Sequence, residues 1–172
     1  MPAAETLYIQ SMNPTEWSAL LILASASSFT PGPNTALSTA LAANRGLWRC
    51  MHFVCAVPVG WGVLFSLCAA GVGALVATWP ELKWAITLAG SAYLLWLARQ
   101  LSRSRKLAQA DTSRLNVSFL QGVLLQFLNI KAWMLALSIT SGWISGHPDA
   151  PHRALLLLPV MMGFGFFSNL SY

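Results

Sequence analysis

Long apolar segments, separated by short polar stretches, dominate the pattern of this 172-residue chain. About 20 consecutive apolar residues are enough for a helix to cross the hydrocarbon core of a membrane. The segments of sufficient length predict five membrane-spanning helices, at about residues 17–43, 47–77, 82–101, 117–145 and 154–172. The pattern therefore predicts an all-α polytopic membrane protein, whose last helix is still running where the chain stops at Tyr172.

The amino-acid composition also indicates a membrane protein. Of all residues, 56% are apolar and 9% are charged, whereas about 25% are charged in an ordinary soluble domain. The formal net charge is +5, but the basic residues flank the spans, so we do not expect nucleic-acid binding. Cys50, Cys55 and Cys68 lie in one apolar segment without the spacing of a disulfide framework or a metal site, and we expect no metal and no cofactor.

The basic residues outside the spans predict the orientation of the chain. Loops rich in Lys and Arg stay in the cytoplasm. One side of the membrane would carry only Lys83 and Arg153. The other side would carry Arg45, Arg49, Arg99, Arg103, Arg105, Lys106 and Arg114. We therefore expect the N-terminus outside and the loop at residues 102–116 in the cytoplasm.

Two predicted spans are interrupted near their middle. The first contains Phe29-Thr30-Pro31-Gly32-Pro33-Asn34, and the fourth contains Phe127-Leu128-Asn129-Ile130-Lys131. Prolines break a helix, and a membrane tolerates a break only where it faces protein or a wet cavity. Lys131 is the only charge between Leu115 and Pro148, and a charge at this depth costs about 2.5–3.5 kcal/mol on insertion scales. Both features indicate a transporter.

The predicted orientation makes the two interrupted spans enter the membrane from opposite sides. If spans one to three and span four onward are repeats, the repeats are inverted and each opens with a broken helix. Paired interruptions in inverted halves indicate a binding site near the midplane of a secondary transporter. A three-plus-three repeat requires six spans, so we expect residues 1–172 to be a single transmembrane transporter domain truncated at its C-terminus.

The candidate binding groups lie at the two interruptions. Carbonyls left unpaired before the first break can coordinate an ammonium group, and the N–H groups near Asn34 and Thr35 suit a carboxylate. Lys131 either binds a substrate carboxylate or takes part in a proton relay, or it donates to the freed carbonyls and locks the halves together. Asn129 can bridge the broken segments. The predicted substrate-binding residues are Pro31, Gly32, Pro33, Asn34, Asn129 and Lys131.

Structural interpretations are favoured for the other polar groups of the spans. Gln121, Gln126 and Asn169 are expected to face the bundle and form interhelical hydrogen bonds. No Asp or Glu lies within a span, so a transported proton would be carried by His52, Lys131, the substrate or a further C-terminal part. A proline kink that serves packing alone is the alternative for the first break. A packing surface of glycines is expected at Gly60, Gly62, Gly71 and Gly73.

Three segments resemble the signatures of a known family. Phe29-Thr30-Pro31-Gly32-Pro33-Asn34 with Leu37, followed by Arg45-Gly46, resembles the opening signature of the lysine-exporter/homoserine–threonine-resistance (LysE/RhtB) amino-acid exporters. Ala89-Gly90-Ser91-Ala92-Tyr93-Leu94 with Trp96 and Leu97 is similar to the third-span signature of that family.

The third matching segment runs from Ser118-Phe119 to Asn129-Ile130-Lys131 and is similar to the fourth-span signature. The family usually has Asn-Pro-Lys where this chain has Asn129-Ile130-Lys131. In that respect the chain resembles the branch of cysteine/O-acetylserine exporters, which also lacks the proline.

The resemblance implies six spans and export of an amino acid or a small derivative through the bacterial inner membrane, coupled to protons. The expected partners are a cysteine/O-acetylserine or homoserine/threonine type of substrate, protons and the lipid bilayer, and association into a homo-oligomer is left open. We do not expect an enzyme, because the one candidate set, His52 with Cys50 or Cys55, does not share a helix face well. A structural or assembly subunit without transport activity is the alternative.

Overall fold

A computed structural model of the chain describes residues 12–71 and 117–172, with scattered positions between residues 78 and 99. Every regular element in this part is helical, which confirms the all-α prediction there. The predicted third span, 82–101, lies largely outside the described residues. The elements are α1 (Pro14–Phe29), α2 (Pro33–Arg45), α3 (Leu47–Ala69), α6 (Phe119–Leu128), α7 (Ile130–Ile139), the π-helical turn η2 (Thr140–Ile144) and α8 (Ala150–Leu170).

Two of these helices, α3 and α8, are long and apolar enough to cross a membrane. Helix α6, together with the segment Ile130–Ile144, meets the same measure as one span that is bent by 69°. The described part therefore contains up to three candidate spans by length and composition. They agree with a membrane-embedded chain, whereas the five spans and the inverted repeat stay predictions.

The first predicted break is confirmed between α1 and α2. Helix α1 ends at Phe29 because Pro31 disfavours a helical conformation for Thr30, which is extended with φ −77° and ψ 127°. Pro33 is the first residue of α2, where its missing N–H removes no helical hydrogen bond. Sequence alone therefore accounts for both ends of this break.

The second predicted break is confirmed at Asn129, although Ile130 replaces the proline that the family usually has. Asn129 is extended, with φ −93° and ψ 101°, and its Oδ1 accepts the backbone N–H of Lys131 at 3.1 Å. This side-chain cap starts α7. The indole N–H of Trp133 donates to the carbonyl of Phe127 at 2.8 Å, which satisfies a carbonyl at the end of α6.

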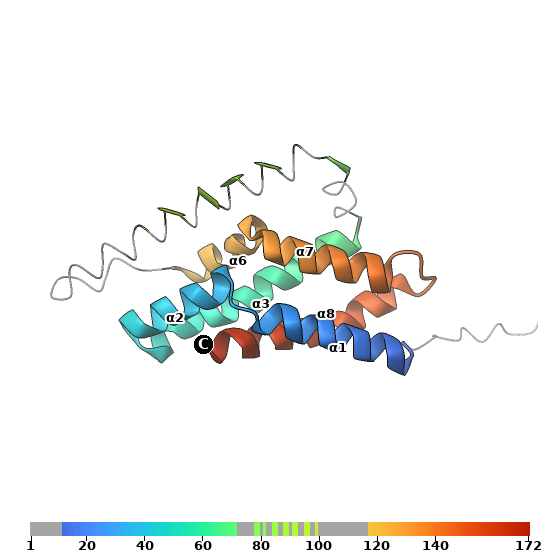
Figure 1. The fold of residues 1–172 in the computed structure, drawn as a ribbon, viewed down its shortest axis with the longest axis horizontal. Coiled ribbons are helices and arrows are strands. Elements are labelled where there is room, and N and C mark those ends of the chain that lie inside the picture. The colour runs from blue at the N-terminus through green and yellow to red at the C-terminus, as the bar shows by residue number, and fades with distance from the viewer. Residues whose placement is uncertain are drawn as a thin grey trace, which may run out of the picture.

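The two broken pairs run in opposite directions along the bundle (Figure 1). Helix α1 leads from one end of the molecule to its middle and α2 continues to the other end, whereas α6 and α7 run the other way. Helix α3 packs against α2, α6, α7 and α8. Both breaks consequently lie near the middle of the long axis.

Buried apolar side chains form two clusters, one toward each end of the bundle. One cluster includes Leu20 of α1 and Phe65 of α3, and it extends over α7 and α8. The other includes Phe53 of α3, with contributions from α2 and α6. The buried polar side chains of Gln126 and Asn129 lie at the breaks, where the two clusters meet. The interior is therefore apolar toward both ends and polar in the middle.

Two helix boundaries differ from the predictions. Helix α3 ends at Ala69, before the predicted residue 77, and Gly71 follows with φ 102°, a conformation that favours glycine. Helix α8 begins at Ala150, before the predicted residue 154. The prediction started this span near Ala154 and counted Arg153 among the basic residues outside the spans. The charge is accommodated by ion pairs within the first turn of the helix.

Those ion pairs tie the start of α8 to the start of α1. Arg153 is only 4% exposed, and its guanidinium lies 2.9 Å from Oε1 of Glu16 and 3.1 Å from Oδ1 of Asp149. Oε2 of Glu16 also accepts the backbone N–H of Asn13 at 2.8 Å, within a capping box at the start of α1. The basic residue that served only as an orientation signal in the sequence is thus a packing residue.

Close contacts of α3 confirm the packing role predicted for two glycines. A Cβ on Gly60 would lie 2.5 Å from the carbonyl oxygen of Val123 in α6, and a Cβ on Gly62 would lie 3.2 Å from a side chain of α8. At Gly71 no atom of the described residues lies within 4 Å of an added Cβ, so the described part gives no support to the packing prediction there. Gly73 lies outside the described residues.

We predict that Gly60→Ala destabilises the protein by about 1–3 kcal/mol, because the added methyl group forces α3 and α6 apart. The matched control is Gly163→Ala in α8, where no atom lies within 4 Å of the added methyl group and alanine is favoured in a helix by about 0.5–1 kcal/mol. Thermal unfolding in detergent should give a lower midpoint for Gly60→Ala only. Equal midpoints for the two variants would contradict the close α3–α6 contact.

We predict a pH-dependent contribution of Glu16. The hydrogen bond from Arg153, followed by that from the Asn13 backbone, lowers the pKa of the Glu16 carboxyl below its ordinary value of 4.5. A lowered pKa means stability that is present above pH 4.5 and is lost as the pH falls through the lowered pKa. Glu16→Gln should therefore lower the unfolding midpoint at neutral pH, and the gap to the unchanged protein should shrink below pH 4.5. A gap that is constant with pH would sink this assignment.

Candidate functional site

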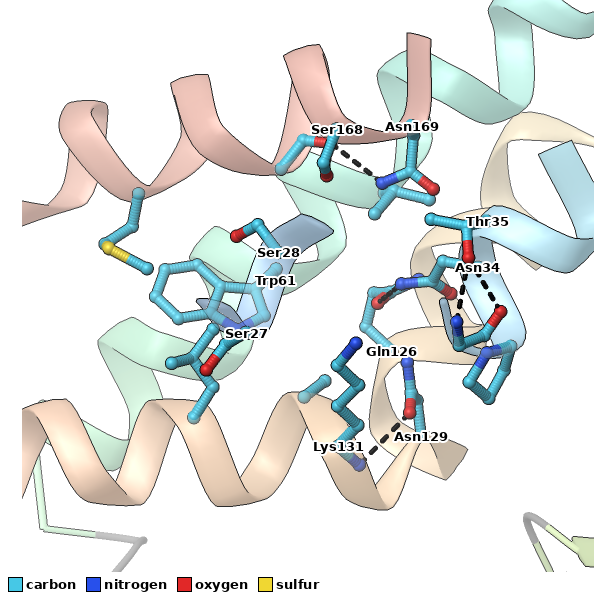
Figure 2. Close-up of a pocket in the computed structure, with 17 residues that line it drawn as sticks. Ser27, Ser28, Asn34, Thr35, Trp61, Gln126, Asn129, Lys131, Ser168 and Asn169 are labelled. Carbon is cyan, nitrogen blue, oxygen red and sulfur yellow. Dashed lines mark hydrogen bonds between the residues drawn. The ribbon is translucent and has the colours of Figure 1, made fainter. Parts of the chain in front are cut away.

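A cavity lies where the two breaks meet (Figure 2). Its volume is about 70 Å³, several times the roughly 10–15 Å³ that one buried water needs. Side chains from α1, α2, α3, α6, α7 and α8 line it. Pro31 lies in the first break but does not line the cavity. The predicted site residues that line it are Gly32, Pro33, Asn34, Asn129 and Lys131.

Lys131 joins the second break to the first. Its Nζ donates to the carbonyl oxygen of Thr30 at 2.6 Å. A Cβ on Gly32 would lie 3.2 Å from Nζ and 3.3 Å from Cδ of this lysine. Since Gly32 has an extended backbone with φ −157°, which any residue adopts, the close approach of Lys131 is what favours glycine here. The predicted contact between Lys131 and a carbonyl of the first break is therefore present, and the Lys131 side chain also lines the cavity.

The carbonyls at the end of α1 are largely occupied, which corrects one interpretation. They were expected to be free for an ammonium group, but Thr30 O accepts from Lys131 and Phe29 O accepts from the hydroxyl of Tyr172 at 2.9 Å. Ala26 O accepts from the hydroxyl of Thr30. The expectation is wrong for these three carbonyls because side chains that are distant in the sequence, or one turn away, supply donors.

A reciprocal amide pair forms the second link between the breaks. Nδ2 of Asn34 donates to Oε1 of Gln126 at 2.8 Å, and Nε2 of Gln126 donates to Oδ1 of Asn34 at 3.2 Å. The interhelical hydrogen bond predicted for Gln126 is confirmed. The Oδ1 of Asn129 caps its own helix, and the observed bridge between the breaks is made by Gln126.

Of the predictions for the remaining polar residues, some are confirmed and some are wrong. Asn169 faces the bundle as expected, and its Oδ1 accepts from the hydroxyl of Ser38 at 3.2 Å. Gln121 is exposed and does not face the bundle, because its Oε1 accepts the backbone N–H of Ser118 at 2.8 Å in the capping box of α6. His52 is exposed and does not line the cavity.

Backbone donors at the start of α2 remain for a ligand. Among the described residues, no acceptor takes the N–H groups of Asn34 and Thr35. Both belong to the first turn of a 13-residue helix, whose positive end favours an anion. With the ammonium of Lys131, they give this part of the cavity a positive character. The chemistry available is the binding of a carboxylate, and no group of three metal-ligating side chains occurs in the described part.

Sequence analysis missed several residues that line the cavity, and they lie outside the two interrupted motifs themselves. Trp61 of α3, Leu135 of α7 and Met161 of α8 supply apolar surface, while Ser27 and Ser28 of α1 supply hydroxyls. The serines lie within one turn of the first break, and this position is a signal that the sequence contains. The apolar residues are ordinary core residues by pattern, so only the packing of three helices identifies them.

Helices that are broken in mid-bundle, with their ends around a polar cavity, define an architecture of membrane transporters. The model of the LysE type translocator family matches residues 25–172. This chain belongs to that family.

Curated relatives are similar over most of the chain. A cysteine/O-acetylserine efflux protein of Klebsiella pneumoniae is 29% identical over 161 residues, which are 94% of this chain and 82% of the relative. Proteins of the same name from Escherichia coli and Shigella sonnei are each 24% identical with the same coverage. No solved structure matches the chain.

We predict that Gln126→Leu destabilises the protein by about 1–3 kcal/mol, because it leaves the partly buried amide of Asn34 without its partner. The double variant Asn34→Leu with Gln126→Leu should recover part of that loss, since both polar groups are then absent. A double-mutant cycle on thermal unfolding measures the coupling, which we expect at about 0.5–3 kcal/mol. Additive effects of the two changes would show that the amide pair contributes nothing.

Proposed function

We propose that this chain exports an amino acid or a small amino-acid derivative from the bacterial cytoplasm through the inner membrane. The similar proteins named as cysteine/O-acetylserine efflux proteins support this activity, and membership of the LysE type translocator family supports the class. The proposed substrates are of the cysteine/O-acetylserine type or of the homoserine/threonine type.

The observation that carries this proposal is the position of Lys131. Its ammonium lies in the wall of the cavity, within hydrogen-bond distance of Thr30 and beside the free N–H groups of Asn34 and Thr35. A cation inside a membrane bundle is costly and marks a substrate or ion pathway. In our proposal the substrate carboxylate binds between Lys131 and the start of α2, and the amide of Asn129 orients it.

In this arrangement, the ammonium group of the substrate competes with the ammonium of Lys131 for the carbonyl oxygen of Thr30. Because Lys131 already donates to Thr30 O at 2.6 Å, an incoming ammonium group would either share that carbonyl with Lys131 or displace it. Displacement would free Lys131 to pair with the substrate carboxylate. Binding would thereby loosen the contact that holds the two breaks together, which is the kind of change that alternating access requires.

The transport cycle that we propose rests on the topology. Residues 1–172 would form one transporter domain with five of six spans in an inverted three-plus-three arrangement. The N-terminus would face outside and the loop at residues 102–116 the cytoplasm. The opposite directions of the α1–α2 and α6–α7 pairs support this arrangement. Substrate would then reach the cavity alternately from the two sides.

Proton coupling is part of the proposal and concerns Lys131 first. Among the described residues that line the cavity, it is the only ionisable side chain. His52, the other candidate within the spans, is exposed outside the cavity. An enzymatic role has no support, since Cys50 is buried while His52 and Cys55 are exposed. A purely structural subunit would account for the contact of Lys131 with Thr30 O, but it would not need a cavity beside that cation.

We predict that Lys131→Ala and Pro31→Ala each lower export at least tenfold in cells preloaded with radiolabelled cysteine or O-acetylserine. The lysine variant removes the cation and the proline variant relaxes the first break. The matched control is Met134→Ala, on the same helix as Lys131 but 63% exposed, which should keep full export. Protein levels in the membrane and unfolding midpoints separate lost transport from lost folding. Full export by both test variants would remove these residues from the mechanism.

A further inference from the structure

The indole N–H of Trp61 is buried and has no hydrogen-bond partner among the residues that the structure describes. Trp61 is only 7% exposed and lines the cavity. Its ring stacks on Phe65, with centroids 5.1 Å apart and an angle of 13° between the planes, so the orientation of the indole is fixed by packing. An indole nitrogen can only donate, and a buried donor without an acceptor costs free energy. The free donor therefore calls for an explanation.

Other tryptophans of the described core do not share this defect. Trp133 donates its N–H to Phe127 O at 2.8 Å, and Trp143 donates to Glu16 O at 3.1 Å. In both cases the acceptor is a backbone carbonyl near a helix end. The unpaired N–H is thus particular to the tryptophan that lines the cavity.

Two further polar groups lie at the same end of the cavity. Ser27 and Ser28 of α1 line it, and no hydrogen bond of their hydroxyls occurs among the described residues. Figure 2 shows these serines and Trp61 toward one end, and Asn34 and Thr35 toward the other. Leu135 and Met161 supply apolar surface to the same cavity. The cavity therefore has a second polar end, which is neutral and is separated from the cationic one.

We infer that Trp61 selects the substrate by donating its indole N–H to an oxygen in the substrate side chain. This inference rests on the proposed function, in which the α-carboxylate lies at Lys131 and the start of α2. The side chain of the bound amino acid then extends toward Trp61. A hydroxyl or ester oxygen accepts the N–H, whereas an apolar side chain of the same shape leaves it unpaired.

Neutral donors fit an uncharged side chain. Among the described residues that line the cavity, no acidic side chain faces a cationic substrate side chain, and Trp61, Ser27 and Ser28 offer no counter-charge to an anionic one. The substrate class assigned by this end of the cavity is therefore small neutral amino acids with an oxygen acceptor. Threonine-like hydroxyls and acetyl esters both satisfy it, whereas a cysteine thiol is only a weak acceptor and satisfies it less well.

The test compares two ligands of one shape. O-Acetylserine carries ester oxygens, and homoleucine replaces them by methylene and methyl groups. Their affinities for the purified full chain in detergent are measured by titration. We expect a preference of about tenfold for O-acetylserine, the size of one good hydrogen bond. Replacing Trp61 by 3-benzothienylalanine, which keeps the ring shape and lacks the N–H, should abolish that preference and leave the affinity for homoleucine unchanged.

The same replacement at Trp133 is the matched control. There the N–H is already paired with Phe127 O, so its removal should lower the unfolding midpoint and keep the preference between the two ligands. At Trp61 the midpoint of the ligand-free protein should not fall, because no hydrogen bond is lost. A lowered midpoint, or a preference that survives the change at Trp61, overturns the inference.

Efflux measurements distinguish this result from the proposed function. If the unchanged protein binds O-acetylserine with the preference at Trp61 but exports nothing, the proposed transport is wrong and the binding role stands. If it exports O-acetylserine and homoleucine equally, before and after the change at Trp61, transport stands and the selecting role is wrong. If it binds neither compound, the selecting role is wrong, and so is transport of O-acetylserine.

Discussion

The bundle depends on how two broken helices satisfy their backbone groups inside a membrane. Lipid offers no hydrogen bonds, so every freed N–H and carbonyl must find a partner in the protein or in a cavity. Here the end of α1 receives donors from Lys131 and Tyr172, each far away in the sequence. The amides of Asn34 and Gln126 join the start of α2 to the end of α6. The two breaks are thus linked to each other through Lys131 and the amide pair.

This mutual dependence explains why the polar groups gather at one depth. Two apolar clusters fill the ends of the bundle, and the polar side chains lie where helices stop and start. Small residues allow the approach that such links require: Gly60 brings α3 against α6, and Gly32 leaves room for Lys131. The cavity is what remains between elements that cannot close completely, because two helix ends and a lysine occupy the middle.

A single contact therefore joins stability to transport. The ammonium of Lys131 holds the first break through Thr30 O, and the same ammonium is the group that a carboxylate would attract. In the proposed mechanism, a substrate that binds between Lys131 and α2 competes with the contact between Lys131 and Thr30 O. Ligand binding can shift a conformational equilibrium only by such a difference in affinity between two states. In this mechanism, the contact that links the two breaks and the proposed binding site share the ammonium of Lys131.

The sequence by itself determined the class, the two breaks and the identity of the cation. Apolar length, the prolines at 31 and 33, and a lone charge in an apolar segment are local signals, because each follows from the residue and its near neighbours. Asn129 also acts locally, as a cap that replaces a missing proline. Only the tertiary structure decided which groups meet: Lys131 with Thr30, Asn34 with Gln126, Arg153 with Glu16, and Trp61 with the cavity. These pairs join residues that are far apart in the chain, or helices that approach closely. The periodicity of apolar residues shows which face of a helix is buried, but it does not show which faces pack against each other.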